Sequence, residues 1–255
     1  MAKPDHILLC TGLKIPILYE DHAVLAIDKP RGWLLAPSDW RHTGRNLLLA
    51  LESSLAAGDF WAKSRNIRFL RFVHRLDADT SGVLLLVKNP GAVRAFSQLF
   101  ESHQIEKTYW AVTGKTPRNT EWVCRRKVGP HPEKVGLMIV DEKKGKPAET
   151  HFRTLCQQPN GTLIEARPKT GRSHQIRLHL SISNCPVLHD PLYGHPAQKD
   201  AGHLALRSVS MSYIDPFRKK SIHIHASTHD FINEYGFSNF QTPEYRKGNP
   251  KPAGA

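Results

Sequence analysis

One short stretch of the chain gathers side chains that could do acid–base chemistry. His74, Arg75 and Asp77 fall within four residues, and a polar turn leads from them into the five apolar residues 83–87. Such an apolar run, bounded by turn formers, predicts a strand buried on both faces. A loop at the mouth of that strand could hold an imidazole, a guanidinium and a carboxylate rigidly beside a ligand. The same residue types also form ordinary turns, and Arg75 with Asp77 could be a structural ion pair.

A second stretch gathers cations where a strand pattern ends and a helix is predicted to begin. It contains Lys169, Arg172, His174 and Arg177, with Ser173 as the predicted N-cap of the helix. Amide groups and basic side chains at the start of a helix together favour an anion-binding site. Taken alone, Arg177 could equally be a residue on the surface of the helix.

The composition favours a polyanionic partner. The 255 residues include 36 Lys and Arg against 23 Asp and Glu, which gives a net charge of +13. A field of that sign attracts nucleic acid or an anionic membrane surface, but no apolar run approaches the ~20 residues that span a bilayer. The cysteines are scattered without a Cys-x-x-Cys pair, which predicts reduced thiols in a cytoplasmic protein. They are Cys10, Cys124, Cys156 and Cys185.

Strand patterns flank the first stretch on both sides. Residues 17–19 and 23–27 suggest a strand pair joined by a polar turn, and residues 107–112 suggest a further strand. Residues 120–156 look like a run of short antiparallel strands. Asn160-Gly161 then gives a strong signal for a hairpin between two more.

Two helices are predicted from their caps. Asn46 is the expected N-cap of the first and Asn89 of the second, whose apolar residues between 92 and 100 share one face and should pack on the core. Between these helices, residues 59–73 mix cations with aromatic rings, which suits contacts with phosphates and bases. The alternative for this segment is a strand with core aromatic residues and a basic outer face.

The first stretch, His74-Arg75-Leu76-Asp77-x-x-Thr80-Ser81-Gly82, resembles the signature loop of the RluA-type pseudouridine synthases. The second, Lys169-Thr170-Gly171-Arg172-x-His174-Gln175-Ile176-Arg177, resembles another distinctive motif of that family. The resemblance implies that Asp77 is the essential catalytic residue and that Arg177 pairs with it. It also implies that Tyr109 is the active-site tyrosine, which packs against the target base.

Weaker matches follow in the family's order, and some positions depart from it. Lys29-Pro30-x-Gly32, residues 145–150 and residues 190–194 are similar to family motifs. Where the family usually has glycine before Asp190, this chain has His189. It also has Leu206-Arg207-Ser208 and Asp215-Pro216 where Leu-His-Ala and His-Pro are common. These departures bear on RNA selectivity more than on chemistry, because they lie far in sequence from the aspartate loop.

The resemblance implies an α+β fold, with a mixed, mostly antiparallel central sheet, flanking helices and a catalytic cleft. We expect residues 1–15 to be a lead-in, residues 16–230 to be the pseudouridine synthase catalytic domain, and residues 231–255 to be a tail that is disordered at its end. Because the first family motif begins so early, an N-terminal S4-type RNA-binding domain is not expected. The chain resembles short members that modify tRNA, large-subunit rRNA or both.

The chemistry that the resemblance implies needs few residues. The base–sugar bond of a uridine breaks, the base rotates, and carbon 5 rejoins the sugar, so no cofactor is implied. Asp77 could stabilise positive charge at the anomeric carbon, attack that carbon or remove the adjacent sugar proton. The uridine must leave its stack, and Arg75 is the candidate to fill the vacated space. The further expected RNA contacts are His74, Lys29, Lys169, Arg172 and His174.

Two other functions compete with this interpretation. One is an RNA-binding protein or chaperone without turnover, against which the set Asp77, Tyr109 and Arg177 argues. The other is a metallohydrolase that uses His223 and His225, which alternation puts on one face of a strand. No third ligand follows at a suitable spacing, so we expect no metal. We expect a monomer whose partner is a stem-loop of tRNA or rRNA, with no membrane contact.

Overall fold

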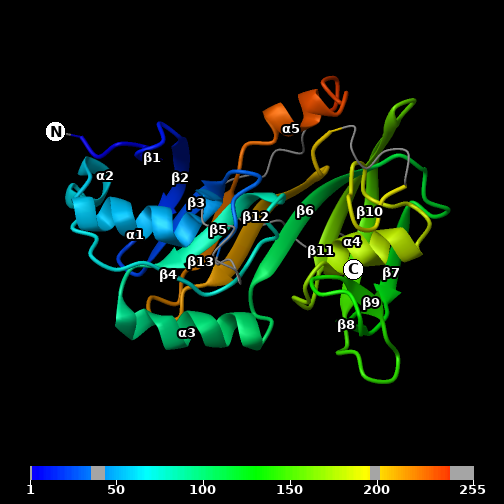
Figure 1. Ribbon diagram of the computed structural model, residues 1–255, viewed down its shortest axis with the longest axis horizontal. Helices are drawn as coiled ribbons and strands as arrows, with labels where there is room; N and C mark the ends of the chain where they lie inside the picture. Colours follow the sequence, from blue (N-terminus) through cyan, green and yellow to red (C-terminus); the bar gives the residue numbers. More distant parts are fainter. Residues whose placement is uncertain (1, 36–43, 196–201, 242–255) are drawn as a thin grey trace.

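The computed structural model describes residues 2–35, 44–195 and 202–241, and its centre is one large sheet (Figure 1). Within these residues eleven strands join in the sheet, in the order β1-β2-β3-β5-β12-β6-β11-β10-β7, with β4 beside β5 and β13 beside β12. Among these described strand pairs, β5 with β12 is parallel and the others are antiparallel. The expected α+β fold with a mixed, mostly antiparallel sheet is confirmed.

The elements have the following bounds. The strands of the large sheet are β1 (His6–Leu8), β2 (Lys14–Glu20), β3 (Val24–Lys29), β4 (Arg71–Phe72), β5 (Ser81–Val87), β6 (Glu106–Thr113), β7 (Glu121–Arg125), β10 (Glu149–Gln158), β11 (Gly161–Pro168), β12 (Leu206–Ile214) and β13 (Ser221–His225). A separate hairpin consists of β8 (Val128–Pro130) and β9 (Met138–Val140). The helices are α1 (Leu47–Ala57), α2 (Phe60–Lys63), α3 (Pro90–Glu101), α4 (Gln175–Ile182) and α5 (His229–Glu234).

Strand β5 is buried on both faces, as its apolar run predicts. Its side chains alternate: Leu84 and Leu86 pack in one core cluster with residues of α1, and Val83, Leu85 and Val87 pack in another with residues of α3. In Figure 1, α1 lies at the left of the molecule and α3 along the bottom. The loop that precedes β5 is therefore attached to a strand that is buried on both faces.

The predicted N-caps of α1 and α3 are confirmed. The side chain of Asn46 accepts a hydrogen bond from Leu49 N–H, and α1 ends at Gly58 in the left-handed conformation. The side chain of Asn89 likewise accepts from Ala92 N–H at the start of α3. The hairpin that Asn160-Gly161 predicts is present between β10 and β11, but its turn consists of residues 159–160, and Gly161 is the first residue of β11.

Both ends of the expected catalytic domain extend further than the sequence suggested. Ile7 in β1 is fully buried, so the lead-in belongs to the sheet. Phe231, Ile232 and Phe237 also join the main core cluster, so packed residues continue past the expected boundary at residue 230. Apolar side chains there bury surface that a tail would leave in water. The expected disorder at the end of the tail lies outside the described residues.

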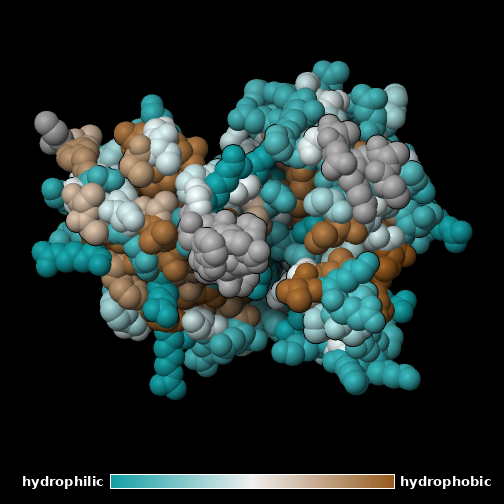
Figure 2. Space-filling model, in the orientation of Figure 1, coloured by the Kyte–Doolittle hydropathy of each residue, from teal (hydrophilic) through white to brown (hydrophobic). Residues whose placement is uncertain are grey.

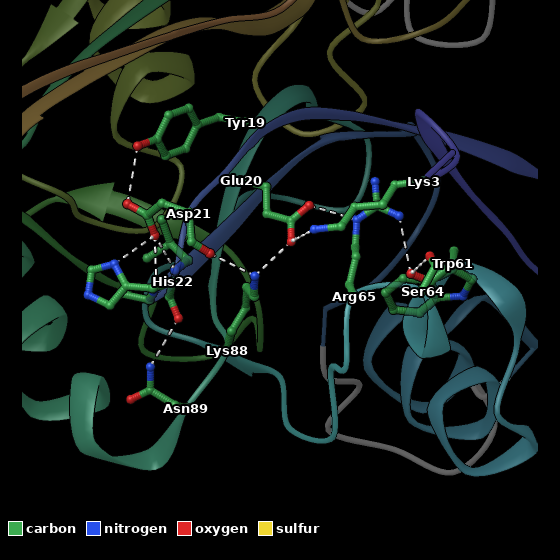
Figure 3. Close-up of polar contacts among 12 residues, drawn as sticks. Lys3, Tyr19, Glu20, Asp21, His22, Trp61, Ser64, Arg65, Lys88 and Asn89 are labelled. Atoms are coloured by element: carbon green, nitrogen blue, oxygen red, sulfur yellow. Dashed lines mark hydrogen bonds and ion pairs between the residues drawn. The ribbon is translucent and has the colours of Figure 1, made fainter. Parts of the chain in front are cut away.

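The basic and aromatic segment 59–73 fits neither interpretation completely. It forms the short helix α2, turns, and β4, and Trp61 is buried in the core. Arg65 Nε donates to Glu20 at 2.7 Å, and Lys88 Nζ donates to the same carboxylate at 2.8 Å (Figure 3). These hydrogen bonds hold the pKa of Glu20 below its usual range although burial opposes them. Arg65 is therefore a structural residue.

Apolar residues reach the surface in both halves of the molecule. On the face in Figure 2, they lie over α1, α2 and β1 at the left and near α4 and β7 at the right, among hydrophilic residues. Leu8, Leu49 and Phe60 are among the exposed apolar residues of the first region. In the part of the chain that the structure describes, none of the helices has the length and apolar character needed to cross a membrane.

Candidate active site

A cavity of about 430 Å³ brings the two sequence motifs together. Its lining includes Asp77, Tyr109 and Arg177, the three residues expected to be catalytic. Of the six expected RNA contacts, four also line it: His74, Arg75, Arg172 and His174. Residues almost a hundred positions apart in the sequence thus face one space.

The register of three neighbouring strands sets the aspartate loop beside Tyr109. Gly82 in β5 lies opposite Ser208 in β12, and Ser208 lies opposite Tyr109 in β6. Gly82 has φ of +109°, and a Cβ atom there would collide with the Ser208 backbone carbonyl. Only glycine tolerates both conditions, which explains this position of the motif in physical terms.

Lys29 supports the aspartate loop through hydrogen bonds to backbone carbonyl groups. Its Nζ donates to the carbonyl oxygens of Pro30, Ala78 and Thr80 at 2.7–3.1 Å, and the residue has 0% exposure. Burial lowers the pKa of the ammonium to about 8, against the opposing charges of Asp79 and Asp77. The expected RNA contact does not fit this burial, because all three protons of the ammonium already point at the loop backbone.

Arg177 joins two carboxylates. Its Nε and Nη2 donate to the two oxygens of Asp190 at 2.8 Å each, and its Nη1 donates to Asp77 Oδ2 at 3.1 Å. The expected contact between Asp77 and Arg177 is therefore present. Burial would lower the pKa of the guanidinium, but the bonds and charges of Asp190 and Asp77 raise it above its ordinary value. The same bonds hold the pKa of Asp190 low against the effect of burial.

His174 approaches the other oxygen of Asp77, with Nε2 at 3.9 Å from Oδ1. Its Nδ1 lies 2.9 Å from the Tyr193 hydroxyl, which accepts a bond from Met138 N–H. Donation of the hydroxyl proton to Nδ1 would put the proton of the neutral imidazole on Nε2, toward Asp77. Burial lowers the pKa of His174, although the charge of Asp77 opposes this shift. The neutral ring is therefore favoured near neutral pH.

Tyr109 presents a buried ring at the wall of the cavity. Burial first, and the charge of Asp77 second, raise the pKa of its hydroxyl above the ordinary value. The phenol therefore stays protonated at neutral pH and offers an apolar face with a neutral donor.

His74 is held by the protein on two sides. Its Nε2 accepts a hydrogen bond from Leu85 N–H at 2.9 Å, and its ring stacks on Phe100 with centroids 4.5 Å apart. Burial, with the nearby charge of Lys107, lowers the pKa of His74 to about 3. The neutral His74 ring, held by these partners, orients the aspartate loop against β5. His74 therefore has a structural role in addition to its expected contact with RNA.

The helix start of the second motif differs from the prediction. The helix α4 begins at Gln175 after His174 in the left-handed conformation, and no side chain caps it, so Ser173 is not the N-cap. The Gln175 side chain instead ties the loop down: Oε1 accepts from Thr170 Oγ1 and Arg172 N–H. Arg172 N–H is therefore engaged within the loop and is not free for an anion.

The remaining expected contacts differ in position. Arg75 is exposed at the rim of the cavity. Arg172 is half-buried and its Nε donates to the Pro147 carbonyl at 3.0 Å. Lys169 is exposed beyond the end of β11 and does not line the cavity.

Two of the departures from the family pattern, Arg207 and Asp215, are interior features. Arg207 spans three elements: it donates to Asp28 Oδ2, Ser81 Oγ and the Ser227 carbonyl. Asp215 has 0% exposure and accepts from the N–H groups of the turn that follows it. Neither side chain lines the cavity, so both act on the framework of the site.

The histidine pair on β13 has the expected alternation. His223 and His225 are both exposed on one face of the strand. Among the residues that the structure describes, no group of three or more His, Cys, Asp or Glu side chains is arranged to hold a metal ion.

Sequence reasoning assigned no role to three residues of this site. Asp190 is the main partner of Arg177, Tyr193 holds His174, and Lys107 lines the cavity. The motif at 190–194 marked the first two as a recognisable stretch, but local spacing could not say what they touch. Lys107 is two residues from Tyr109 in a strand, so alternation could have put both on one face.

Comparisons with known proteins agree with this geometry. A family model described as RNA pseudouridylate synthase matches residues 23–182. An RNA pseudouridine synthase of Zymomonas mobilis is 34% identical over 225 residues, which cover 87% of this chain and 97% of the relative. Ribosomal large subunit pseudouridine synthase C of Vibrio cholerae is 32% identical over 82% of this chain and 64% of its own length. The solved structure of human RNA pseudouridylate synthase domain containing 4 aligns with a TM-score of 0.70 at 21% identity, over 89% of this chain and 94% of that one. The chain belongs to the RNA pseudouridylate synthase family of RNA-modifying isomerases.

Proposed function

We propose that the protein isomerises specific uridines to pseudouridine in structured RNA, either tRNA or large-subunit rRNA, with Asp77 as the essential catalytic residue. The observation that carries this proposal is the position of Asp77 between Arg177 and His174 in a cavity that also exposes Tyr109. Large-subunit rRNA is favoured as the substrate because relatives that are 32% identical to this chain are named ribosomal large subunit pseudouridine synthase C.

The residues divide the reaction between them. Arg177 keeps Asp77 oriented, while Asp190 fixes Arg177 through two bonds. The bond between the anomeric carbon and N1 breaks, and its electron pair leaves with the base. The base turns against the Tyr109 ring, carbon 5 bonds to the anomeric carbon, and the carbon 5 proton is lost while N1 gains one. Substrate and product are isomers, so the balance needs no other reactant.

The uridine has to leave its stack before it can enter the cavity. Arg75, exposed at the rim, is the proposed residue that fills the vacated space. Asp77, Tyr109 and Arg177 all come from one chain, which supports a monomer as the active species. All four cysteines are free thiols, which supports a cytoplasmic location.

The test is tritium release from RNA labelled at uridine carbon 5, with wild-type protein and Asp77→Asn. Asparagine can still accept a bond from Arg177 but lacks the charge and basicity of the carboxylate. Release should fall by at least about a hundredfold, the scale of a lost acid–base group. The melting temperature should stay near that of the wild type. Asp79→Asn is the matched control, since Asp79 is exposed in the same loop and does not line the cavity.

A folded Asp77→Asn protein that releases tritium at the wild-type rate would remove Asp77 from the chemistry. Absence of release by the wild-type protein on both tRNA and large-subunit rRNA would instead contradict the proposed substrate class. Mapping pseudouridines in total RNA with and without the gene then identifies the position that the enzyme modifies.

A further inference from the structure

Lys107 is a cation in the lining of the cavity, and the proposed chemistry leaves it unused. Lys107 lies in β6, two residues before Tyr109, so both side chains are on the same face of the sheet. Both line the cavity. Their separation along the strand is about 7 Å, which is comparable to the length of one nucleotide.

Among the described residues, the Lys107 ammonium packs against a loop but has no carboxylate partner. A Cβ atom built on Gly171 would lie 3.7 Å from Lys107 Nζ, so the ammonium sits against the loop of the second motif. The ammonium is also near His74, because its charge helps to lower the pKa of that imidazole, which is neutral near neutral pH. Within the described ranges 2–35, 44–195 and 202–241, Lys107 Nζ has neither a hydrogen bond nor an ion pair.

Burial lowers the pKa of Lys107 to about 8, so at neutral pH the group is still a cation. A partly desolvated ammonium without a partner is costly to a folded protein and gains most from an incoming anion. Lys29 has a similarly lowered pKa but contrasts with it, since three carbonyl oxygens accept its protons. The structure thus satisfies one buried lysine internally and leaves the other directed to the cavity.

We propose that Lys107 binds a backbone phosphate of the RNA, next to the uridine whose base lies on Tyr109. This inference rests on the proposed function, because it takes the flipped uridine as the occupant of the cavity. A phosphate supplies the missing counter-charge, and strand β6 then fixes the distance between that phosphate and the base. Lys107 would therefore set where the nucleotide sits along the strand.

The test compares Lys107→Met, Lys107→Arg and Lys115→Met. Lys115 is the matched control: it is exposed just beyond the other end of β6 and does not line the cavity. The probe for binding is a short oligouridylate, which offers uridines without the cost of unstacking a folded RNA. Its dissociation constant is measured as a function of salt for each variant, and melting temperatures confirm folding.

Lys107→Met should weaken binding by roughly tenfold, the scale of one bond to a charged group. It should also reduce the slope of log affinity against log salt by about 0.7, the value for one single-strand phosphate. Lys107→Arg should restore most of both quantities, and Lys115→Met should change neither. In turnover of an in vitro transcript of large-subunit rRNA, Lys107→Met should raise KM by a larger factor than it lowers kcat.

An unchanged salt slope in Lys107→Met would overturn the proposal. A loss of kcat without a change of the salt slope would also overturn it, because the ammonium would then act on the base. The salt slope needs no turnover, so it tests Lys107 even if the wild-type protein releases no tritium. Failure of the proposed function and failure of this inference are therefore separate results.

Discussion

At the scale of single residues, Asp77 is held by two groups of different strength. Arg177 carries a permanent charge and cannot swing toward a phosphate without breaking its two bonds to the buried Asp190. His174 is neutral and lies farther from the carboxylate. The guanidinium therefore orients Asp77, while the imidazole can respond to a ligand that enters the cavity. A bound RNA phosphate would raise the pKa of that imidazole and favour its charged form.

His74 gives a prediction about stability and pH. The pKa of His74 in the folded protein is lowered to about 3, whereas a histidine in the unfolded chain titrates near 6.5. As the pH falls below 6.5, the unfolded state binds a proton that the folded state refuses, so the free energy of unfolding decreases. His74→Gln keeps an acceptor for Leu85 N–H and does not titrate. Its free energy of unfolding should fall less steeply, by up to about 1.4 kcal/mol per pH unit.

Urea unfolding at pH 7 and pH 5 measures this difference between wild type and His74→Gln. The other histidines with lowered pKa values, His174, His179 and His225, are present in both proteins and cancel in the comparison. Equal pH slopes for the two proteins would mean that His74 takes up its proton in the folded state.

At the scale of elements, the site depends on the junction of β5, β12 and β6. Gly82, Ser208 and Tyr109 lie side by side across these strands, and Arg207 ties β12 to Ser81 and to Asp28 of β3. The aspartate loop is thus fixed to the strand that carries Tyr109 through a neighbour far away in sequence. Any change that pushes β5 from β12 should move Asp77 relative to the base.

Gly82→Ala tests this junction. The new Cβ would collide with the Ser208 carbonyl, and the backbone there has a positive φ that alanine tolerates poorly. The free energy of unfolding should fall by about 3 kcal/mol or more, from strain plus the displaced strand. Tritium release should fall with it. Gly91→Ala is the control, because a Cβ in α3 meets its nearest atom at 3.6 Å and should cost little. Equal stabilities in denaturant would show that the two strands separate without cost.

Local sequence patterns predicted the helices and turns better than they predicted which strands lie next to one another in the sheet. The caps Asn46 and Asn89 and the hairpin turn at 159–160 act over a few residues, so the sequence carries most of the signal. The insertion of β12 between β5 and β6 could not be predicted, because it depends on packing between segments that are far apart in the chain. Ser173 was wrong as a cap because the side chain of Gln175 satisfies the loop instead.

The same limit applies to the site. The resemblance supplied the contact of Asp77 with Arg177, which the structure confirms, but not the partner that fixes Arg177. Asp190 lies 13 residues beyond Arg177 and reaches it only because the chain turns back after α4. Lys29 was expected at the RNA because it is a lysine in a family motif, and only its burial reveals three backbone acceptors.

At the scale of the whole molecule, segments near both ends of the described chain pack onto the folded body. The strand β1 adds to one edge of the sheet, and α5 with the residues after it packs on the main core. The Tyr235 hydroxyl donates to the His203 carbonyl at 2.8 Å, and Phe240 meets Trp110 edge-on at 5.7 Å. Trp110 neighbours Tyr109 in β6, so the C-terminal segment supports the strand that carries the site tyrosine.

Phe237→Ala measures how far the body depends on this segment. Phe237 has 0% exposure, so its loss should lower the free energy of unfolding by about 3–5 kcal/mol, from the lost burial and the cavity left behind. Phe60→Ala is the matched control, since Phe60 is 50% exposed and should cost less than about 1 kcal/mol. Urea denaturation of both variants gives the comparison. If Phe237→Ala were no less stable than Phe60→Ala, residues 231–240 would be an appendage, and the boundary at residue 230 would stand after all.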